Sequence, residues 1–258
     1  MSEPAEAFYL PLGDDRYEPT RATESPWDPG AQHGGPPTAL LGHLLDEAAG
    51  PGMRLARISA DFLGAIPRRP FRVEVAQLRP GRRIALSEAR MVFDDRPAVV
   101  ARAWAIATGP TPPSTGERIQ PPALPGTGQG PDLTGWGYGE AIEWRFTRGG
   151  HDTASGAADV WTRVRIPLIA GEKPTGLDRT LVVADSANGL SAALPMTEWL
   201  FIPPSITVTL GRFPEAEWVH LACRSHLSTD GLGVSHATLS DPDGHLGEVS
   251  QPLLVRER

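Results

Sequence analysis

The sequence has a single cysteine, Cys223, so an internal disulfide bond is impossible and a disulfide-built scaffold is excluded. Cys223 lies in a strand-like segment with no base beside it, and we expect a buried structural thiol. Cysteine and histidine show no zinc-ligand spacing, which predicts no metal site; the scattered histidines are His151, His220, His226, His236 and His245. No apolar run approaches the roughly 18 residues that span a bilayer, and the first ten residues lack signal-peptide character. We therefore expect a cytoplasmic protein without membrane insertion.

Lysine is also scarce, since Lys173 is the only one among 24 basic residues, and the net charge is −7. An acidic chain of this kind argues against general nucleic-acid binding. The 40% hydrophobic and 21% charged residues exclude a wholly disordered chain. Glycine (28) and proline (27) are abundant but follow no collagen period. This composition favours many short strands joined by turns.

The chain reads as one unit written twice, with an offset of 147 positions. Residues 63–67, a Leu-Gly-x-x-Pro segment, align with residues 210–214, and Phe71 aligns with Trp218. A stretch dominated by Pro, Gly, Ser and Thr separates the two copies. We predict a tandem duplication with an N-terminal unit at 1–110, a linker at 111–138 and a C-terminal unit at 139–258.

Each unit is expected to hold one helix and an antiparallel meander. Apolar residues at helical spacing predict a helix from Pro36 or Pro37 to Gly50 and a shorter one from Asp185 to Leu194. Strands are predicted at 55–63, 71–78, 84–92 and 98–106, then at 140–146, 160–166, 205–210, 218–227, 233–239 and 247–255. A helix crossed by a curled sheet buries itself well in about 110 residues, so the fold class is α+β with a continuous sheet.

Several short motifs follow one another in a fixed order. They are Trp27 with 32–35 (QHGG), 62–67, 79–82 (RPGR), 184–189 (ADSANG), 212–214 (RFP) and 249–251 (VSQ). This ordered set resembles the double-hotdog acyl-CoA thioesterases, in particular the bacterial medium-chain type II (TesB-like) enzymes and their actinobacterial relatives. The resemblance covers about Tyr9 to Val255. It implies two tandem hotdog units and hydrolysis of medium- or long-chain acyl-CoA to a free acid and coenzyme A, without cofactor or metal.

The resemblance also implies a catalytic trio of Asp, hydroxyl and Gln. Asp185 matches the acid and Gln251 the amide, while the hydroxyl stays open between Ser205 and Thr207, because a proline stands where the family's Thr would be. Asp185 would accept the proton of a water that Gln251 and the hydroxyl hold in line. Without the resemblance, Asp185 is more often a helix-capping acid and Gln251 a solvent-facing strand residue.

Other parts of the sequence are candidates for binding substrate. Backbone N–H groups near Gly34 and Gly35 suit an oxyanion, although the two glycines also suit a turn before a helix. An apolar groove for the acyl chain would use residues 199–201. Coenzyme A carries phosphates, and two arginine-rich turns are candidates for them: Arg68, Arg69 and Arg72, and Arg79, Arg82 and Arg83.

Two further functions are weighed against hydrolysis. A non-catalytic or weakly active acyl-CoA or acyl-carrier binding protein would keep the fold without an efficient site. A hotdog dehydratase or hydratase is disfavoured, because no Asp and His pair is placed as those enzymes place theirs. A serine hydrolase is disfavoured because the G-x-S-x-G motif is missing, although residues 33–35 are similar to a lipase oxyanion loop. The exposed sheet edge expected here leaves a homodimer or higher homo-oligomer open.

Overall fold

The computed structural model describes residues 5–110, 112–113, 119–126, 133–149 and 155–258. Its helices are η1 (Arg21–Thr23), α1 (Gly35–Ala49), α2 (Gly137–Glu140), α3 (Gly176–Ala184) and α4 (Ala187–Leu190). Its strands are β1 (Tyr9–Gly13), β2 (Arg16–Pro19), β3 (Met53–Phe62), β4 (Phe71–Arg79), β5 (Ile84–Phe93), β6 (Arg96–Ala107), β7 (Ile142–Arg148), β8 (Ala157–Val164), β9 (Trp199–Ile202), β10 (Ser205–Leu210), β11 (Trp218–Leu227), β12 (Leu232–Asp241) and β13 (Gly244–Glu257).

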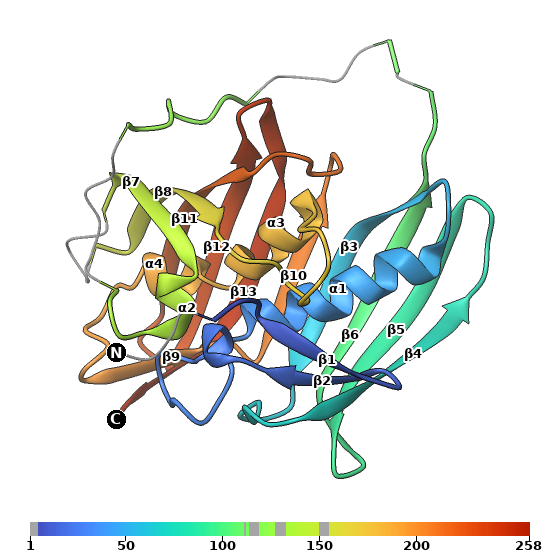
Figure 1. Ribbon diagram of the computed structural model, residues 1–258. Helices are drawn as coiled ribbons and strands as arrows, with labels where there is room; N and C mark the ends of the chain where they lie inside the picture. The colour runs from blue at the N-terminus through green and yellow to red at the C-terminus, as the bar shows by residue number, and fades with distance from the viewer. Residues whose placement is uncertain (1–4, 111, 114–118, 127–132, 150–154) are drawn as a thin grey trace.

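All the strands belong to one antiparallel sheet with β3 and β10 paired at its centre (Figure 1). Outward from that pair, one side runs β3-β6-β5-β4-β2-β1 and the other runs β10-β13-β12-β11-β8-β7. The strands of the two halves therefore follow the same order outward from the centre, with β3, β6, β5 and β4 corresponding to β10, β13, β12 and β11. β9 adds to β13 beside this path.

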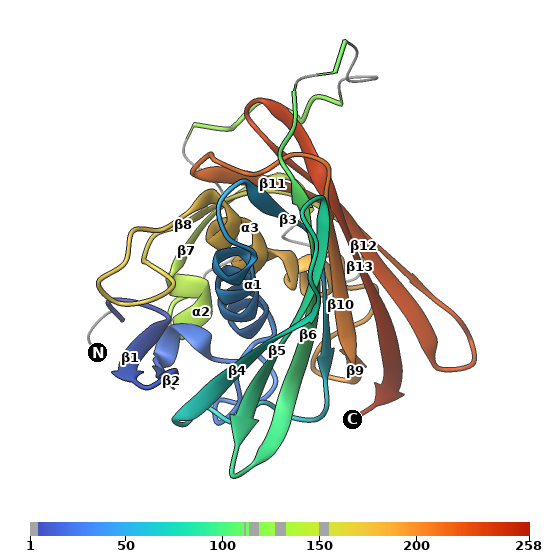
Figure 2. The same cartoon turned by 90° about the vertical axis from the view of Figure 1, so that its right-hand side faces the viewer.

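The helices lie on the inner, concave side of the sheet, which wraps around α1 and α3 (Figure 2). α1 and α3 approach each other closely, because a Cβ on Gly42 would stand 2.4 Å from a methyl carbon of Leu181. One apolar cluster includes Leu40 of α1, Leu181 of α3, Ile58 of β3 and Leu239 of β12. The N-terminal and C-terminal halves of the chain thus share one hydrophobic core.

The first predicted helix and all ten predicted strands are present, with ends shifted by at most a few residues. The second helix differs from the prediction. Thr175 and Asp178 form a capping box that starts α3 at Gly176, well before Asp185. The segment predicted as helical, from Asp185 to Leu194, holds only the short α4 (Ala187–Leu190), while the longer α3 lies before it and has Asp185 as its C-cap residue. Strands β1, β2 and β9 were not predicted.

The described residues between the two halves include 119–126, which cross the outer face of β7 and β8. The indole N–H of Trp161 donates to the carbonyl of Pro122 at 3.0 Å, and Arg145 donates to that of Pro125 at 2.7 Å. This contact explains why Trp161 is only 2% exposed on an outer strand face. The remaining predicted linker residues, and His151, lie partly or wholly outside the described residues. In the described part of the chain, no helix is both long and apolar enough to cross a membrane.

Candidate active site

Asp185 and Gln251 meet on the inner side of the sheet. The amide nitrogen of Gln251 donates to Oδ1 of Asp185 at 2.8 Å. Gln251 is on β13 and faces inward like Val249 and Leu253, because side chains alternate along a strand. Its side chain is fully buried, and Asp185 is 7% exposed. A buried amide thus holds a buried carboxylate that stands where α3 ends.

His33, which the sequence placed in the QHGG motif but not among the catalytic candidates, contacts the other oxygen of this carboxylate. Its Nδ1 lies 3.2 Å from Oδ2 of Asp185. The imidazole stacks on the ring of Tyr138, with centroids 4.1 Å apart and planes 15° apart. Tyr138 is itself fixed, since its hydroxyl donates to the carbonyl of Val182 at 2.8 Å and lies 2.8 Å from Ser186 Oγ.

Gly34 and Gly35 bring the start of α1 against Asp185. A Cβ on Gly34 would stand 2.8 Å from Oδ2 of Asp185 and 2.7 Å from the ring of Phe62. A Cβ on Gly35 would stand 2.1 Å from the carbonyl oxygen of Val182 in α3. The backbone N–H groups of both glycines act on the Asp185 carboxylate and lower its pKa. Their predicted contact with a substrate oxyanion stays a prediction.

Burial dominates the electrostatics of the site. Loss of hydration raises the pKa of Asp185, against the lowering effects of His33, the two glycine N–H groups and Gln251. Burial lowers the pKa of His33, and the Asp185 charge opposes that shift. The pKa of Tyr138 is raised by burial, so its phenol stays neutral. The site therefore holds a carboxylate that is a stronger base than usual beside an imidazole that is mostly neutral near pH 7.

Ser205 and Thr207 lie on the opposite face of the sheet from this carboxylate. Thr207 is paired with Ser250 in the β10–β13 ladder, and directly paired residues share a face. The residue after Ser250 is Gln251, which points to the other face. The hydroxyl of Thr207 lies 2.9 Å from that of Ser59 on the outer side. The structure does not bring either hydroxyl to Asp185, because Ile206 occupies the inner face between them.

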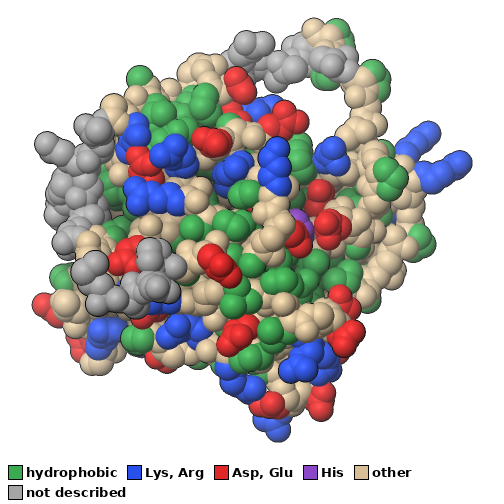
Figure 3. Space-filling model, viewed as in Figure 1, with side chains coloured by type: hydrophobic (Ala, Val, Ile, Leu, Met, Phe, Trp, Pro, Cys, Tyr) green, Lys and Arg blue, Asp and Glu red, His purple; other side chains and the backbone are tan. Residues whose placement is uncertain are grey.

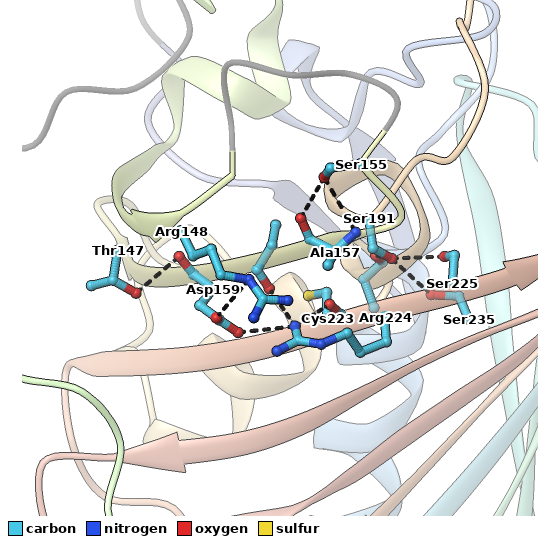
Figure 4. A network of polar contacts seen from close by, with 12 residues as sticks. Thr147, Arg148, Ser155, Ala157, Asp159, Ser191, Cys223, Arg224, Ser225 and Ser235 are labelled. Carbon is cyan, nitrogen blue, oxygen red and sulfur yellow. Dashed lines mark hydrogen bonds and ion pairs between the residues drawn. The ribbon is translucent and has the colours of Figure 1, made fainter.

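Three serine hydroxyl groups on the inner face beside Gln251 form hydrogen bonds with one another. Ser235 is paired with Gln251 in the β12–β13 ladder and lies near Ser191, which is 2.7 Å from Ser225 (Figure 4). Ser191 donates to the carbonyl of Ala187 at 2.7 Å. Cys223, drawn in the same view, is fully buried as predicted, and burial raises the pKa of its thiol. These groups form structural contacts rather than a nucleophile with its base.

The two arginine clusters lie at opposite ends of β4. Near its start, Arg69 pairs with Asp94, Arg72 pairs with Glu74 and Asp95, and Arg68 donates to the carbonyl of Pro29 at 2.8 Å. Near its end, Arg79 donates to the carbonyl of Ile84 at 2.8 Å, and no ion pair to Arg82 or Arg83 is found within the described residues. Basic and acidic side chains are also interspersed over the face drawn in Figure 3. A role of either cluster in phosphate binding stays a prediction.

Comparison with known families gives this geometry a context. The model of the acyl-CoA thioesterase N-terminal domain matches residues 23–106, and that of the acyl-CoA thioesterase C-terminal domain matches residues 116–255. The chain belongs to the acyl-CoA thioesterase family. The family predicted from the ordered motifs is thereby confirmed. A search among curated proteins finds no match to this thioesterase-family chain.

Solved structures show the same fold at low sequence identity. A protein of unknown function with a hotdog fold from Alicyclobacillus acidocaldarius superposes with a TM-score of 0.74 at 15% identity, over 98% of this chain and 97% of that one. The tesB protein of Mycobacterium avium subsp. paratuberculosis gives 0.68 at 17% identity, over 96% and 95%. The acyl-CoA thioesterase II TesB2 of Mycobacterium marinum gives 0.66 at 16% identity, over 97% and 96%. The thioesterase-family chain is thus an α+β protein with hotdog-fold neighbours.

Proposed function

We propose that this protein hydrolyses acyl-CoA thioesters to a free acid and coenzyme A, with Asp185 as the general base. The observation that carries the proposal is the 2.8 Å hydrogen bond between Gln251 and Asp185 in a buried site. Family membership supplies the substrate class. A carboxylate whose pKa is raised by burial is suited to accept a proton from water near neutral pH.

Gln251 contributes a second group to the proposed reaction. Its amide nitrogen is committed to Asp185, while its buried carbonyl oxygen has no partner within the described residues. A water that donates one hydrogen to Asp185 and the other to this Oε1 would turn a lone pair toward a thioester carbonyl. That orientation converts an encounter into an aligned attack.

In the proposed reaction, Asp185 carries one proton from the water to the coenzyme A thiolate. The water oxygen bonds to the carbonyl carbon and its proton passes to Asp185; the C–S bond breaks, and the coenzyme A thiolate takes up that proton. The positive end of the α1 dipole lies at Gly35, beside the site, and favours the negative charge that develops on the carbonyl oxygen. No covalent enzyme intermediate is required.

The proposed organisation is a double hotdog, with units at 1–110 and 139–258 joined by 111–138. The matching strand order on the two sides of β3 and β10 supports it. For medium or long acyl chains, we propose the apolar hollow of about 700 Å³ that Leu194, Trp199, Leu227 and Val255 help to line. Val255 faces inward on β13 four residues beyond Gln251, which is roughly 13 Å along a strand.

The test is release of free thiol from a panel of acyl-CoAs of increasing chain length. Asp185→Asn and Gln251→Ala should each lose about 10²- to 10⁴-fold in kcat/KM. Asp243→Asn and Gln77→Ala, which change exposed residues of the same types, should match the wild type. Acyl-pantetheine substrates, which lack the nucleotide phosphates of coenzyme A, test the role of Arg82 and Arg83. The double variant Arg82→Glu with Arg83→Glu should raise KM for acyl-CoA but not for acyl-pantetheine.

A second function is favoured by one observation, the placement of Ser205 and Thr207 on the outer face. A family member without the third group could bind acyl-CoA without cleaving it efficiently. Binding of acyl-CoA without thiol release from any member of the panel would support that function and contradict hydrolysis. Full activity in both Asp185→Asn and Gln251→Ala would contradict the proposed site.

A further inference from the structure

We propose that His33 is a positioning residue for Asp185: its Nδ1–H donates to Oδ2 and holds the carboxylate in the orientation that accepts the proton of water. This inference rests on the proposed function, in which Asp185 is the base. It assigns a role in the same site to a residue from the N-terminal half of the chain.

The contact itself requires a proton between the two atoms. Nδ1 and Oδ2 are 3.2 Å apart, and an unprotonated nitrogen facing a carboxylate oxygen would be repelled. The backbone N–H of Gly35 points at Nδ1 at 3.2 Å and also acts on the Asp185 carboxylate, whose pKa it lowers. Because a charged carboxylate is the stronger acceptor, we assign this N–H to Asp185 and the proton of the contact to Nδ1. With the proton on Nδ1, His33 and Gly35 both donate to the carboxylate, and every donor has an acceptor.

The surroundings of His33 fix the direction of that donor. The backbone N–H of His33 donates to the carbonyl of Thr23 at 2.7 Å, which anchors the loop before α1. The ring is stacked on Tyr138, and Tyr138 is tied to α3 through Val182. The His33 imidazole and the Asp185 carboxylate are therefore both held in place relative to α3. Neither side chain can rotate without losing a packed contact.

The place of His33 also explains how the site works without a hydroxyl from β10. Gln251 holds Oδ1 of Asp185 from the sheet, and His33 holds Oδ2 from the start of α1. Two donors on two oxygens define the plane of the carboxylate. Ser205 and Thr207 are turned to the outer face and cannot supply that second contact.

Charge coupling between the two residues gives a second readout. The titratable groups that face His33 are Asp185, at the end of α3, and Tyr138, on α2, which stays neutral. Asp185 raises the pKa of His33, and His33 lowers that of Asp185. Replacing either residue should therefore move the titration of the other in a known direction.

The experiment compares His33→Ala with His33→Asn in the full chain. The Asn side chain places an N–H donor near the position of Nδ1 but has no counterpart of Nε2. We expect His33→Ala to lower kcat about 10²-fold with little change in KM, because the carboxylate loses its orientation. We expect His33→Asn to recover most of that loss. His245→Ala, at the start of β13 and remote from Asp185 in the sheet, is the matched histidine control and should keep wild-type turnover.

The pH profile and an NMR titration complete the test. In His33→Ala the acid limb of kcat/KM should move to higher pH, because a group that lowers the pKa of Asp185 is gone. In Asp185→Asn the imidazole pKa of His33 should fall. The proposal is overturned if His33→Asn is as inactive as His33→Ala, which would make Nε2 the base, or if the His33 titration ignores Asp185→Asn. A wild type that cleaves no acyl-CoA would contradict the proposed function alone, since the titration still measures the contact.

Discussion

The buried carboxylate of Asp185 destabilises the folded protein at neutral pH. Asp185 is 7% exposed and is surrounded by donors from three places: the start of α1, the imidazole of His33 and the amide of Gln251. Those donors do not offset the loss of hydration, because the net effect on its pKa is a rise. A residue that weakens the fold while standing among aligned polar groups is typical of a functional site.

The first prediction follows from that imbalance. The folded-state pKa of Asp185 lies above its ordinary value of 3.8, so the folded protein binds a proton more tightly than the unfolded chain does. Stability is therefore lost as the pH rises through the interval between the two pKa values, and the cost persists at pH 7. Asp185→Asn should raise the free energy of unfolding by roughly 0.5–2 kcal/mol at pH 7 while abolishing most activity. Urea unfolding at pH 7 and at pH 3.5 measures this.

The gain in Asp185→Asn should be much smaller at pH 3.5, where the wild-type carboxyl is protonated in the folded state and about two-thirds protonated in the unfolded chain. A variant less stable than the wild type at pH 7 would show that the donors around Asp185 outweigh its burial.

At the scale of elements, the alternation of β10 and β13 decides which side chains reach the site. Ile206, Val208 and Leu210 face the core, so the polar residues between them face outward. This alternation is visible in the sequence and could have placed Ser205 and Thr207 correctly. The resemblance predicted the strand but left the hydroxyl open between Ser205 and Thr207.

The second prediction tests this alternation. Ser205→Ala and Thr207→Ala should each keep turnover within about threefold of the wild type, because neither hydroxyl reaches the inner face. Thr207→Ala should cost about 0.5–1.5 kcal/mol of stability through its lost contact with Ser59. A hundredfold loss of kcat in either variant, with the fold intact by circular dichroism, would mean that β10 presents its other face to substrate.

The third prediction concerns the start of α1. Gly35→Ala should destabilise the fold by about 1–3 kcal/mol, because its Cβ would overlap the backbone carbonyl of Val182. Gly34→Ala meets two side chains instead, Asp185 and Phe62, which can shift. Gly34→Ala should therefore lower kcat while leaving the melting temperature nearly unchanged. Thermal unfolding and thiol release on both variants separate the two effects, and equal losses of stability would contradict the distinction.

Across the whole molecule, the sequence repeat predicted the strands of both halves and a continuous sheet, but not which strands pair where the halves join. The offset of 147 positions predicts a second copy of the meander, whereas the pairing of β3 with β10 depends on contacts about 150 residues apart that no local pattern encodes. The contribution of His33 to the site has the same origin, because it reaches Asp185 only when the halves are joined. Both the joined sheet and the complete site therefore depend on contacts between residues far apart in the sequence, which local sequence patterns do not predict.

The fourth prediction is that the two halves unfold together. Leu40 of α1 and Leu239 of β12 are both fully buried in the same apolar cluster, although they belong to different halves. Leu40→Ala and Leu239→Ala should each lower stability by about 2–5 kcal/mol and move one common thermal transition. Calorimetry checks this, since the calorimetric and van't Hoff enthalpies should agree for the wild type and both variants. If each variant instead shifted its own separate transition, the halves would be independent domains, and the contact between His33 and Asp185 could break without global unfolding.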